Sequence, residues 1–226
     1  MPTTLITGAN RGIGLEFARQ YAADGWRVIA TCRTPAKATA LRKLGATVTV
    51  HAMDVDDHAS VEALAKELRR APIDLLINNA GIYGGTGQRF GRLDDDAWAK
   101  VLRTNVLGPT KVSECFADNV ANSDQKRIVC ISSYMGSIAQ AGGGAYYYGA
   151  SKAALNYVCH AMADDLRSRG ITVIALSPGW VQTDMGGRNA PLTVERSIAS
   201  MRRVIDRLKP SDSGSFRDEN GAALPW

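Results

Sequence analysis

The sequence predicts a doubly wound α/β fold, in which one parallel sheet carries helices on both faces. First, short and almost continuously apolar runs alternate along the chain with segments of helical periodicity. Second, a glycine-rich turn at residues 8–14 joins the first apolar run to the first helical segment. Third, polar residues and glycines follow each apolar run, where a parallel sheet gathers the carboxyl ends of its strands.

The elements follow in order. The first strand is expected at residues 4–7, and the helix after the turn has Leu15, Phe17 and Tyr21 on its apolar side. Further strands are expected at residues 26–31, 47–50, 73–77, 127–132 and 171–176. Helical segments are expected at residues 35–44, 60–70, 94–122 and 145–169. The chain shows no repeat or long linker, so we expect one domain over residues 1–226.

Composition excludes several classes of protein. Apolar residues make up 45% of the chain, which is enough for a large core, and the net charge is only +5. Basic and acidic residues are interleaved, so no nucleic-acid partner is expected. No apolar stretch approaches the ~18 residues of a membrane span, and the four cysteines and three histidines show no metal-ligand spacing. We therefore expect a cytoplasmic protein without a membrane or metal partner.

The glycine-rich turn, Gly8-Ala9-Asn10-Arg11-Gly12-Ile13-Gly14, is typical of a phosphate-binding loop. It leaves backbone N–H groups unpaired at the start of a helix, whose dipole also favours negative charge. Glycines at these positions permit a sharp turn and a close approach of the pyrophosphate or the adjoining strand. Such turns also occur without a ligand, so the motif alone does not decide.

The end of the second strand indicates which dinucleotide binds. An NAD site usually has an acidic residue there, whereas this chain has Arg33, and Arg11 lies in the turn itself. Guanidinium groups suit a ribose 2′-phosphate, although both arginines also fit ordinary surface charges. Asp54, after the third strand, either accepts from the adenine amino group or caps the next helix.

The chemistry is expected from Tyr148 and Lys152, which lie four residues apart and share one face of a helix. A neighbouring ammonium favours the phenolate and lowers the pKa of a tyrosine, which makes it a usable acid and base. Ser133, at the end of the fifth strand, is placed to hold a carbonyl oxygen where negative charge develops. Ser137 is the competing serine, and the position at the strand end favours Ser133.

Seven motifs in chain order resemble the short-chain dehydrogenase/reductase family across nearly the whole length. They are Thr7–Gly14, Asp54-Val55, Asn78-Asn79-Ala80-Gly81, Asn105-Val106-Leu107-Gly108, Ile131-Ser132-Ser133, Tyr148-Gly149-Ala150-Ser151-Lys152 and Pro178–Asp184. Residues 184–187 and 223–226 resemble the sniffer-like and C-factor-like carbonyl reductases within that family. Ser133 precedes Tyr148 by slightly more than is usual, and three glycines at residues 142–144 absorb the extra length.

The resemblance implies a seven-stranded Rossmann sheet, with its last strand near residues 214–216, and an NADP(H) site. It implies a catalytic tetrad: Tyr148 exchanges the proton, Lys152 binds the nicotinamide ribose and lowers the tyrosine's pKa, Ser133 steadies the substrate oxygen, and Asn105 orients a water. It implies cofactor contacts from Gly8, Asn10, Arg11, Gly12, Ile13, Gly14, Arg33, Asp54, Val55, Asn79, Ala80, Gly81, Tyr148, Lys152, Pro178, Gly179, Val181 and Thr183.

The expected activity is NADPH-dependent reduction of an aldehyde or ketone, with dinucleotide and substrate bound by the same domain. The segment over the substrate, residues 185–192, is short, which favours an open site that accepts varied carbonyl compounds. Relatives commonly pair through the helices at residues 94–122 and 145–169, so a homodimer is expected. The alternative is an NADP(H)-binding signalling protein with little turnover, because relatives of the C-factor type are associated with developmental signalling.

Overall fold

The computed structural model describes all 226 residues and contains one seven-stranded sheet. All neighbouring strands are parallel, in the order β3-β2-β1-β4-β5-β6-β7. The strands are β1 (Thr3–Ile6), β2 (Arg27–Cys32), β3 (Val48–Ala52), β4 (Leu75–Asn78), β5 (Arg127–Ile131), β6 (Thr172–Leu176) and β7 (Phe216–Arg217). The predicted doubly wound parallel sheet is confirmed.

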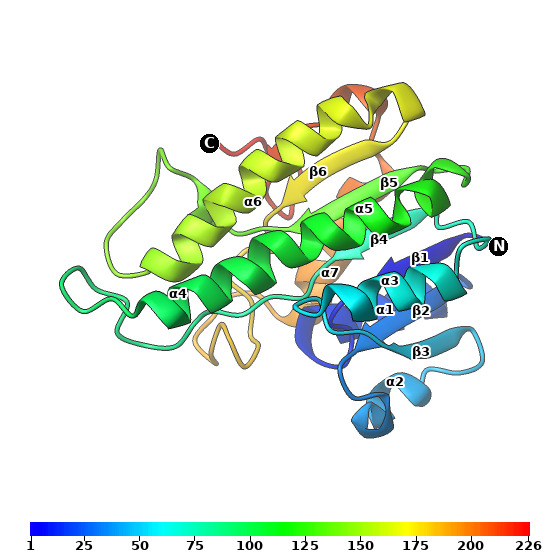
Figure 1. Ribbon diagram of the computed structural model, residues 1–226, viewed down its shortest axis with the longest axis horizontal. Coiled ribbons are helices and arrows are strands. Elements are labelled where there is room, and N and C mark those ends of the chain that lie inside the picture. Colours follow the sequence, from blue (N-terminus) through cyan, green and yellow to red (C-terminus); the bar gives the residue numbers. More distant parts are fainter.

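Helices cover both faces of the sheet (Figure 1). They are α1 (Gly12–Ala23), α2 (Thr39–Arg42), α3 (His58–Glu67), α4 (Asp95–Leu102), α5 (Gly108–Ala121), α6 (Tyr146–Asp165) and α7 (Val194–Asp206). Side chains of α3, α5 and α6 pack on one face, and those of α1, α2 and α7 pack on the other. The strands of Figure 1 run from right to left, so their carboxyl ends meet at the left-hand edge.

The sheet separates two hydrophobic cores because successive side chains of a strand point to opposite faces. Leu5 of β1 belongs to the core under α5 and α6, while its neighbour Ile6 belongs to the core under α1 and α7. Both residues are fully buried. Burial on both faces explains why the strands read as continuous apolar runs rather than as alternating ones.

The helical stretch predicted at residues 94–122 is divided by a π-helical turn, Arg103–Leu107, between α4 and α5. Pro109 accounts for the irregularity, because it lacks the N–H that the Asn105 carbonyl would accept from in an α-helix. The turn therefore falls at Asn105, one of the predicted catalytic residues. The sequence shows Pro109, but it does not predict that the helix is distorted into a π-helical turn.

Other predicted boundaries shift slightly. The helix predicted at residues 35–44 is a 3₁₀ turn, Pro35–Lys37, followed by the single turn of α2. The helix predicted at residues 145–169 ends at Asp165 and continues as a 3₁₀ turn until Gly170 takes a left-handed conformation. None of the helices is long and apolar enough to cross a membrane.

Candidate active site

The glycine turn connects the end of β1 to the start of α1. Gly8 and Gly12 both have positive φ angles, of 62° and 53°, which side-chain-bearing residues rarely adopt. No side chain caps α1, whose N-cap is Arg11. The first N–H groups of the helix are thus left for a ligand, and this arrangement fits the pyrophosphate of a dinucleotide.

The first two residues after β4 hold this turn in place. The Thr7 hydroxyl accepts hydrogen bonds from the backbone N–H groups of Asn79 and Ala80, both at 2.9 Å. The Asn79 amide donates to the carbonyls of Thr7 and Gly8, at 2.8 and 3.1 Å. A Cβ at Gly14 would lie 2.5 Å from this amide nitrogen, so glycine is required there for packing. The Asn79 side chain, predicted to line the cofactor, is therefore committed to shaping the turn.

The residues predicted to select the dinucleotide lie at the same edge. Arg33 follows β2, is exposed, and makes no hydrogen bond or ion pair with another residue. Arg11 is also exposed, but its guanidinium donates to the Asp184 carboxylate at 3.1 Å. Asn10 is exposed and Ile13 is half-buried beside it. The geometry thus leaves one free guanidinium and one that is loosely paired.

Asp54 and Val55 follow β3. One Asp54 carboxylate oxygen accepts from the Asp56 backbone N–H at 3.1 Å, which closes a turn. The cap of α3 is Asp57, whose side chain accepts from the N–H of Ala59. The alternative in which Asp54 caps the next helix is therefore wrong. Val55 is buried, and a Cβ at Gly108 would lie 3.0 Å from its side chain, so it supports the start of α5.

The loop after β6 lies at the same edge of the sheet and reaches the glycine turn through Thr183. Gly179 has a φ of 75°, and Val181 pairs with Leu192 in an isolated parallel bridge. Thr183 lies opposite the glycine turn, because a Cβ at Gly12 would be 3.7 Å from its methyl group. Pro178 accepts a hydrogen bond from the Ser197 hydroxyl through its carbonyl. Of the predicted residues of this loop, Thr183 faces the turn that follows β1, while Pro178, Gly179 and Val181 contact α7 and the segments around Leu192 and Glu219.

The predicted tetrad converges where β4, β5 and α6 meet. The buried Lys152 ammonium donates to the Ile131 carbonyl at 2.7 Å and lies 5.6 Å from the centre of the Tyr148 ring. The Ser133 hydroxyl accepts a hydrogen bond from the Met135 backbone N–H at 3.2 Å and lies near enough to the Tyr148 phenol to favour a lower pKa for it. Ser137 is buried, and its hydroxyl has no partner. Geometry thus favours Ser133 over the competing serine.

Asn105 joins this group from the π-helical turn. Its amide donates to the Ile82 carbonyl and the Ser151 hydroxyl, both at 2.9 Å, and its oxygen accepts from the Ile82 N–H at 2.9 Å. A Cβ at Gly81 would lie 3.3 Å from that oxygen and 3.7 Å from the Lys152 nitrogen. The Asn105 side chain therefore holds the loop that follows β4 in place beside the lysine.

The electrostatics differ from one expectation. Burial raises the pKa of Tyr148 to about 12, and the neighbouring Ser133 hydroxyl only partly opposes this. Burial also lowers the pKa of Lys152 to about 8. The predicted lowering of the tyrosine's pKa by the lysine is thus not found here, because desolvation is the largest effect on the phenol. Although Tyr148 keeps part of its surface open to solvent, its phenol is neutral at pH 7 and carries a proton.

The lowered pKa of Lys152 predicts a pH-dependent stability. Between pH 8 and 10.5 the unfolded chain holds a proton that the folded chain has lost, so the free energy of unfolding rises with pH. Lys152→Met should lack this contribution, and its stability relative to wild type should fall by roughly 3 kcal/mol between pH 7 and pH 10.5. Urea unfolding of both proteins across this range measures the difference. A difference in the free energy of unfolding that stays constant with pH would contradict the lowered pKa of Lys152.

Sequence reasoning missed two side chains of the site. Gln88 is buried in the loop after β4 and contacts the first turn of α6. Tyr83 packs against Tyr148 in a tilted arrangement, with ring centres 5.0 Å apart. Both stand in a glycine-rich loop without helical or strand periodicity, so no pattern in the sequence marked them.

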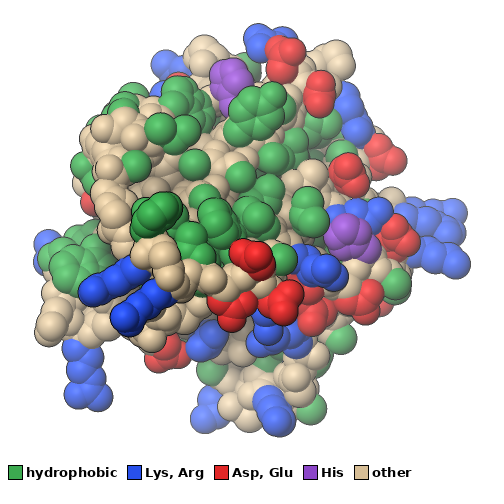
Figure 2. Space-filling view, turned by 60° about the vertical axis from the view of Figure 1, so that its left-hand side comes forward, with side chains coloured by type: hydrophobic (Ala, Val, Ile, Leu, Met, Phe, Trp, Pro, Cys, Tyr) green, Lys and Arg blue, Asp and Glu red, His purple; other side chains and the backbone are tan.

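Several large apolar side chains are exposed in loops at this edge of the sheet. Ile138, Trp180 and Met185 are all at least half exposed, and they belong to the loops after β5 and β6. Figure 2 brings the edge with the carboxyl ends forward: hydrophobic side chains gather across the middle of this face, with most charged ones around it. The surface beside the tetrad is thus suited to an apolar molecule.

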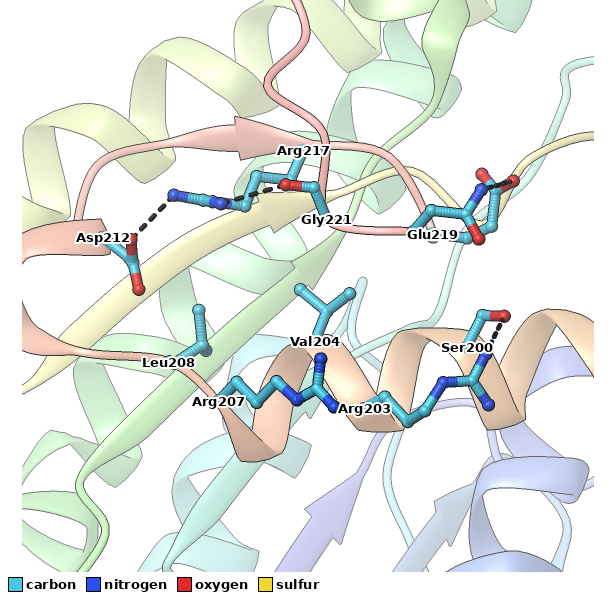
Figure 3. A pocket seen from close by; sticks show the side chains of 10 residues that line it. Ser200, Arg203, Val204, Arg207, Leu208, Asp212, Arg217, Glu219 and Gly221 are labelled. Atoms are coloured by element: carbon cyan, nitrogen blue, oxygen red, sulfur yellow. Dashed lines mark hydrogen bonds and ion pairs between the residues drawn. The ribbon is translucent and has the colours of Figure 1, made fainter.

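A separate cleft of about 200 Å³ lies between α7 and the segment that follows it (Figure 3). Arg203 of α7 and Arg207, just beyond the end of that helix, line one side, and Arg217 lines the other, where it binds Asp212 at 2.7 Å. None of the predicted site residues lines this cleft. No group of three or more His, Cys, Asp or Glu side chains in the molecule is placed to hold a metal ion.

Comparison with known proteins places these features in context. The family model for short chain dehydrogenases matches residues 2–191. C-signal of Myxococcus xanthus is 41% identical over 167 residues, which cover 74% of this chain and all of that protein.

Two solved structures cover the chain from end to end. The NADPH-bound carbonyl reductase from chicken fatty liver has a TM-score of 0.92 and 34% identity, over 100% of this chain and 99% of that one. The NADP complex of a carbonyl reductase from Pseudomonas aeruginosa has a TM-score of 0.89 and 31% identity, over 100% of both chains.

Proposed function

The chain belongs to the short-chain dehydrogenase family of NAD(P)-dependent oxidoreductases, and from this premise we propose that it is an NADPH-dependent carbonyl reductase. One observation carries the proposal: a neutral Tyr148 phenol, with Ser133 nearby, stands beside a buried lysine at the edge that holds the glycine turn. A protonated phenol is the form needed to reduce a carbonyl group. The similar NADPH-bound and NADP-bound carbonyl reductases support the same choice of cofactor and reaction.

Each predicted residue has a role in this proposal. When bound, the nicotinamide supplies a hydride to the carbonyl carbon. Tyr148 gives its proton to the carbonyl oxygen, Ser133 holds that oxygen, and Lys152 binds the nicotinamide ribose and restores the proton. Asn105 orients a water molecule, which returns a proton to Lys152. These roles use geometry already formed in the chain, where the four side chains converge.

We propose that one domain, residues 1–226, supplies both sites. The glycine turn with Arg33, Asp54, Val55 and Ala80 holds the adenosine half, and residues 178–183 hold the nicotinamide half. The substrate lies over Tyr148, against the exposed apolar side chains of the neighbouring loops. Apolar aldehydes and ketones are therefore the favoured class. The four free thiols fit a reducing, cytoplasmic setting.

The test is a screen of aldehydes and ketones for carbonyl-dependent oxidation of NADPH. We expect turnover with several apolar aldehydes and aromatic ketones, and less with charged ones, because the face beside the tetrad is apolar. Turnover with none of them, although NADPH binds, would contradict the proposal.

A second candidate is an NADP(H)-binding signalling protein with little turnover. The observation that favours it is the 41% identity to C-signal. The complete tetrad argues against it, since a protein without turnover has no need to keep all four groups together. Binding of NADPH without turnover in the screen described above would select this alternative.

We also propose a homodimer that forms through the outer surfaces of α4, α5 and α6. Leu107 and Tyr157 are exposed on this side, by 53% and 76%. Light scattering at micromolar concentration should give twice the chain mass of 24.2 kDa. Tyr157→Glu should shift the mass toward one chain, because it places a charge in the apolar contact. A wild-type mass near 24.2 kDa would contradict the dimer.

A further inference from the structure

Gln88 is the one buried side chain in an otherwise open stretch of the loop between β4 and α4. It is 1% exposed, whereas residues 85–87, Arg89 and Phe90 are exposed. Three glycines, Gly84, Gly85 and Gly87, precede it with φ angles near 90°. Such a segment has little stiffness of its own, so its position depends on what holds it.

The Gln88 amide uses its full hydrogen-bonding capacity in two directions. Its oxygen accepts from the backbone N–H groups of Tyr147 and Tyr148, at 2.8 and 3.2 Å. Its nitrogen donates to the carbonyls of Tyr83 and Gly85, at 2.8 and 3.1 Å. An amide with two acceptor bonds and two donor bonds is completely satisfied. It therefore ties the loop to the first turn of α6.

This tie replaces a helix cap that α6 lacks. Ala145 at the N-cap has no side-chain oxygen, so the first N–H groups of α6 have no local partner. Gln88 supplies the acceptor from another part of the chain. On the other side, its bond to the Tyr83 carbonyl fixes the backbone of the residue whose ring packs against the Tyr148 ring, with ring centres 5.0 Å apart.

We propose that Gln88 is a positioning residue for the catalytic tyrosine: it holds the start of α6 and the Tyr83 backbone together, and so sets where the Tyr148 phenol lies. The inference rests on the proposed function for its effect on turnover, but the geometry it describes is a property of the chain alone. Gln88 touches neither the reacting atoms nor the phenol itself. Its influence passes through two backbone segments.

Two substitutions separate the parts of this tie. Gln88→Met has nearly the same shape and loses all four bonds. Gln88→Glu keeps an oxygen for the two α6 N–H groups but loses the donors to the loop. Because a misplacement of about 1 Å costs about 100-fold in rate, kcat should fall by about 100-fold for Met and less for Glu. The Kd for NADPH should change by less than about threefold, since the pyrophosphate site lies across the sheet edge.

Asn119→Leu is the matched control. Asn119 is also a buried amide that donates to two loop carbonyls, those of Leu68 and Ala71, at 2.7 and 2.8 Å. It lies near the end of α5, at the opposite edge of the sheet. Its loss should lower Tm to a similar degree and leave kcat unchanged. A kcat for Gln88→Met within twofold of wild type, or an equal loss in Asn119→Leu, would overturn the positioning role.

A second measurement needs no substrate. In protein labelled with ¹³C at the tyrosine ring, NMR titration reports the pKa of Tyr148. Loosening the Tyr83 segment admits water, so Gln88→Met should lower this pKa from its raised value toward 10, whereas Asn119→Leu should not. If wild type reduces no carbonyl, the proposed function fails and this titration alone decides the inference. If Gln88→Met does not fold, Gln88→Glu decides it by the same two readouts.

Discussion

Replacing Tyr148 with phenylalanine is expected to lower kcat for carbonyl reduction by about 10²–10⁴-fold, because the variant has no proton to give to the carbonyl oxygen. The fold should survive, since the ring keeps its packing against Tyr83 and its contact with the Lys152 side chain. Binding of NADPH should change little. Steady-state kinetics with a reactive aldehyde, together with fluorescence titration of NADPH, measures both quantities.

Tyr147→Phe is the control for this prediction. The Tyr147 hydroxyl accepts a hydrogen bond from the Asp94 backbone N–H at the start of α4, and its ring packs on Trp98. Losing that bond should cost about 1 kcal/mol of stability without a large change in kcat. Carbonyl reduction by Tyr148→Phe at close to the wild-type rate would show that another group is the acid.

The second large effect concerns the cofactor. Arg33 has no partner within the chain, so its guanidinium is available to a 2′-phosphate, and Arg11 must first leave Asp184. A charge-assisted hydrogen bond contributes about 1.5–3 kcal/mol, and about 1.4 kcal/mol is a tenfold change in affinity. We therefore expect NADPH to be preferred over NADH by one to three orders of magnitude in kcat/KM.

Arg33→Asp reverses the charge at this position. The carboxylate repels the 2′-phosphate but can accept from the 2′-hydroxyl of NADH, so affinity for NADPH should fall steeply and that for NADH little. Arg69→Asp makes the same charge change on an exposed residue beyond α3 and should leave both affinities unchanged. Added salt should weaken NADPH binding more than NADH binding. Equal kcat/KM for the two cofactors in wild type would mean that Arg33 is an ordinary surface charge without a role in cofactor selection.

The architecture could be predicted because its signals are local. Strands buried on both faces must be apolar throughout, as Leu5 and Ile6 illustrate, and glycines with positive φ, such as Gly8 and Gly12, mark the turn after β1. The pair Tyr148 and Lys152 could be predicted from helical periodicity alone. The choice of Ser133 over Ser137 stays a prediction from position, because Ser133 comes two residues after the end of β5.

Other features depend on contacts between distant segments. Gln88 acquires its role only when the loop after β4 folds onto α6, and a single glutamine among glycines carries no periodic signal. The Arg11–Asp184 pair joins residues 173 positions apart. The raised pKa of Tyr148 results from burial, and the extent of that burial follows only from the three-dimensional arrangement.

The most direct test of the central claim follows the hydride itself. NADPH carrying deuterium at the transferable position of the nicotinamide ring should yield alcohols with one deuterium on the former carbonyl carbon, as detected by mass spectrometry. Wild type should give this product from at least one apolar aldehyde or ketone, and Tyr148→Phe should give almost none in the same time. Tight binding of NADPH with no deuterated alcohol from any carbonyl compound would contradict the account.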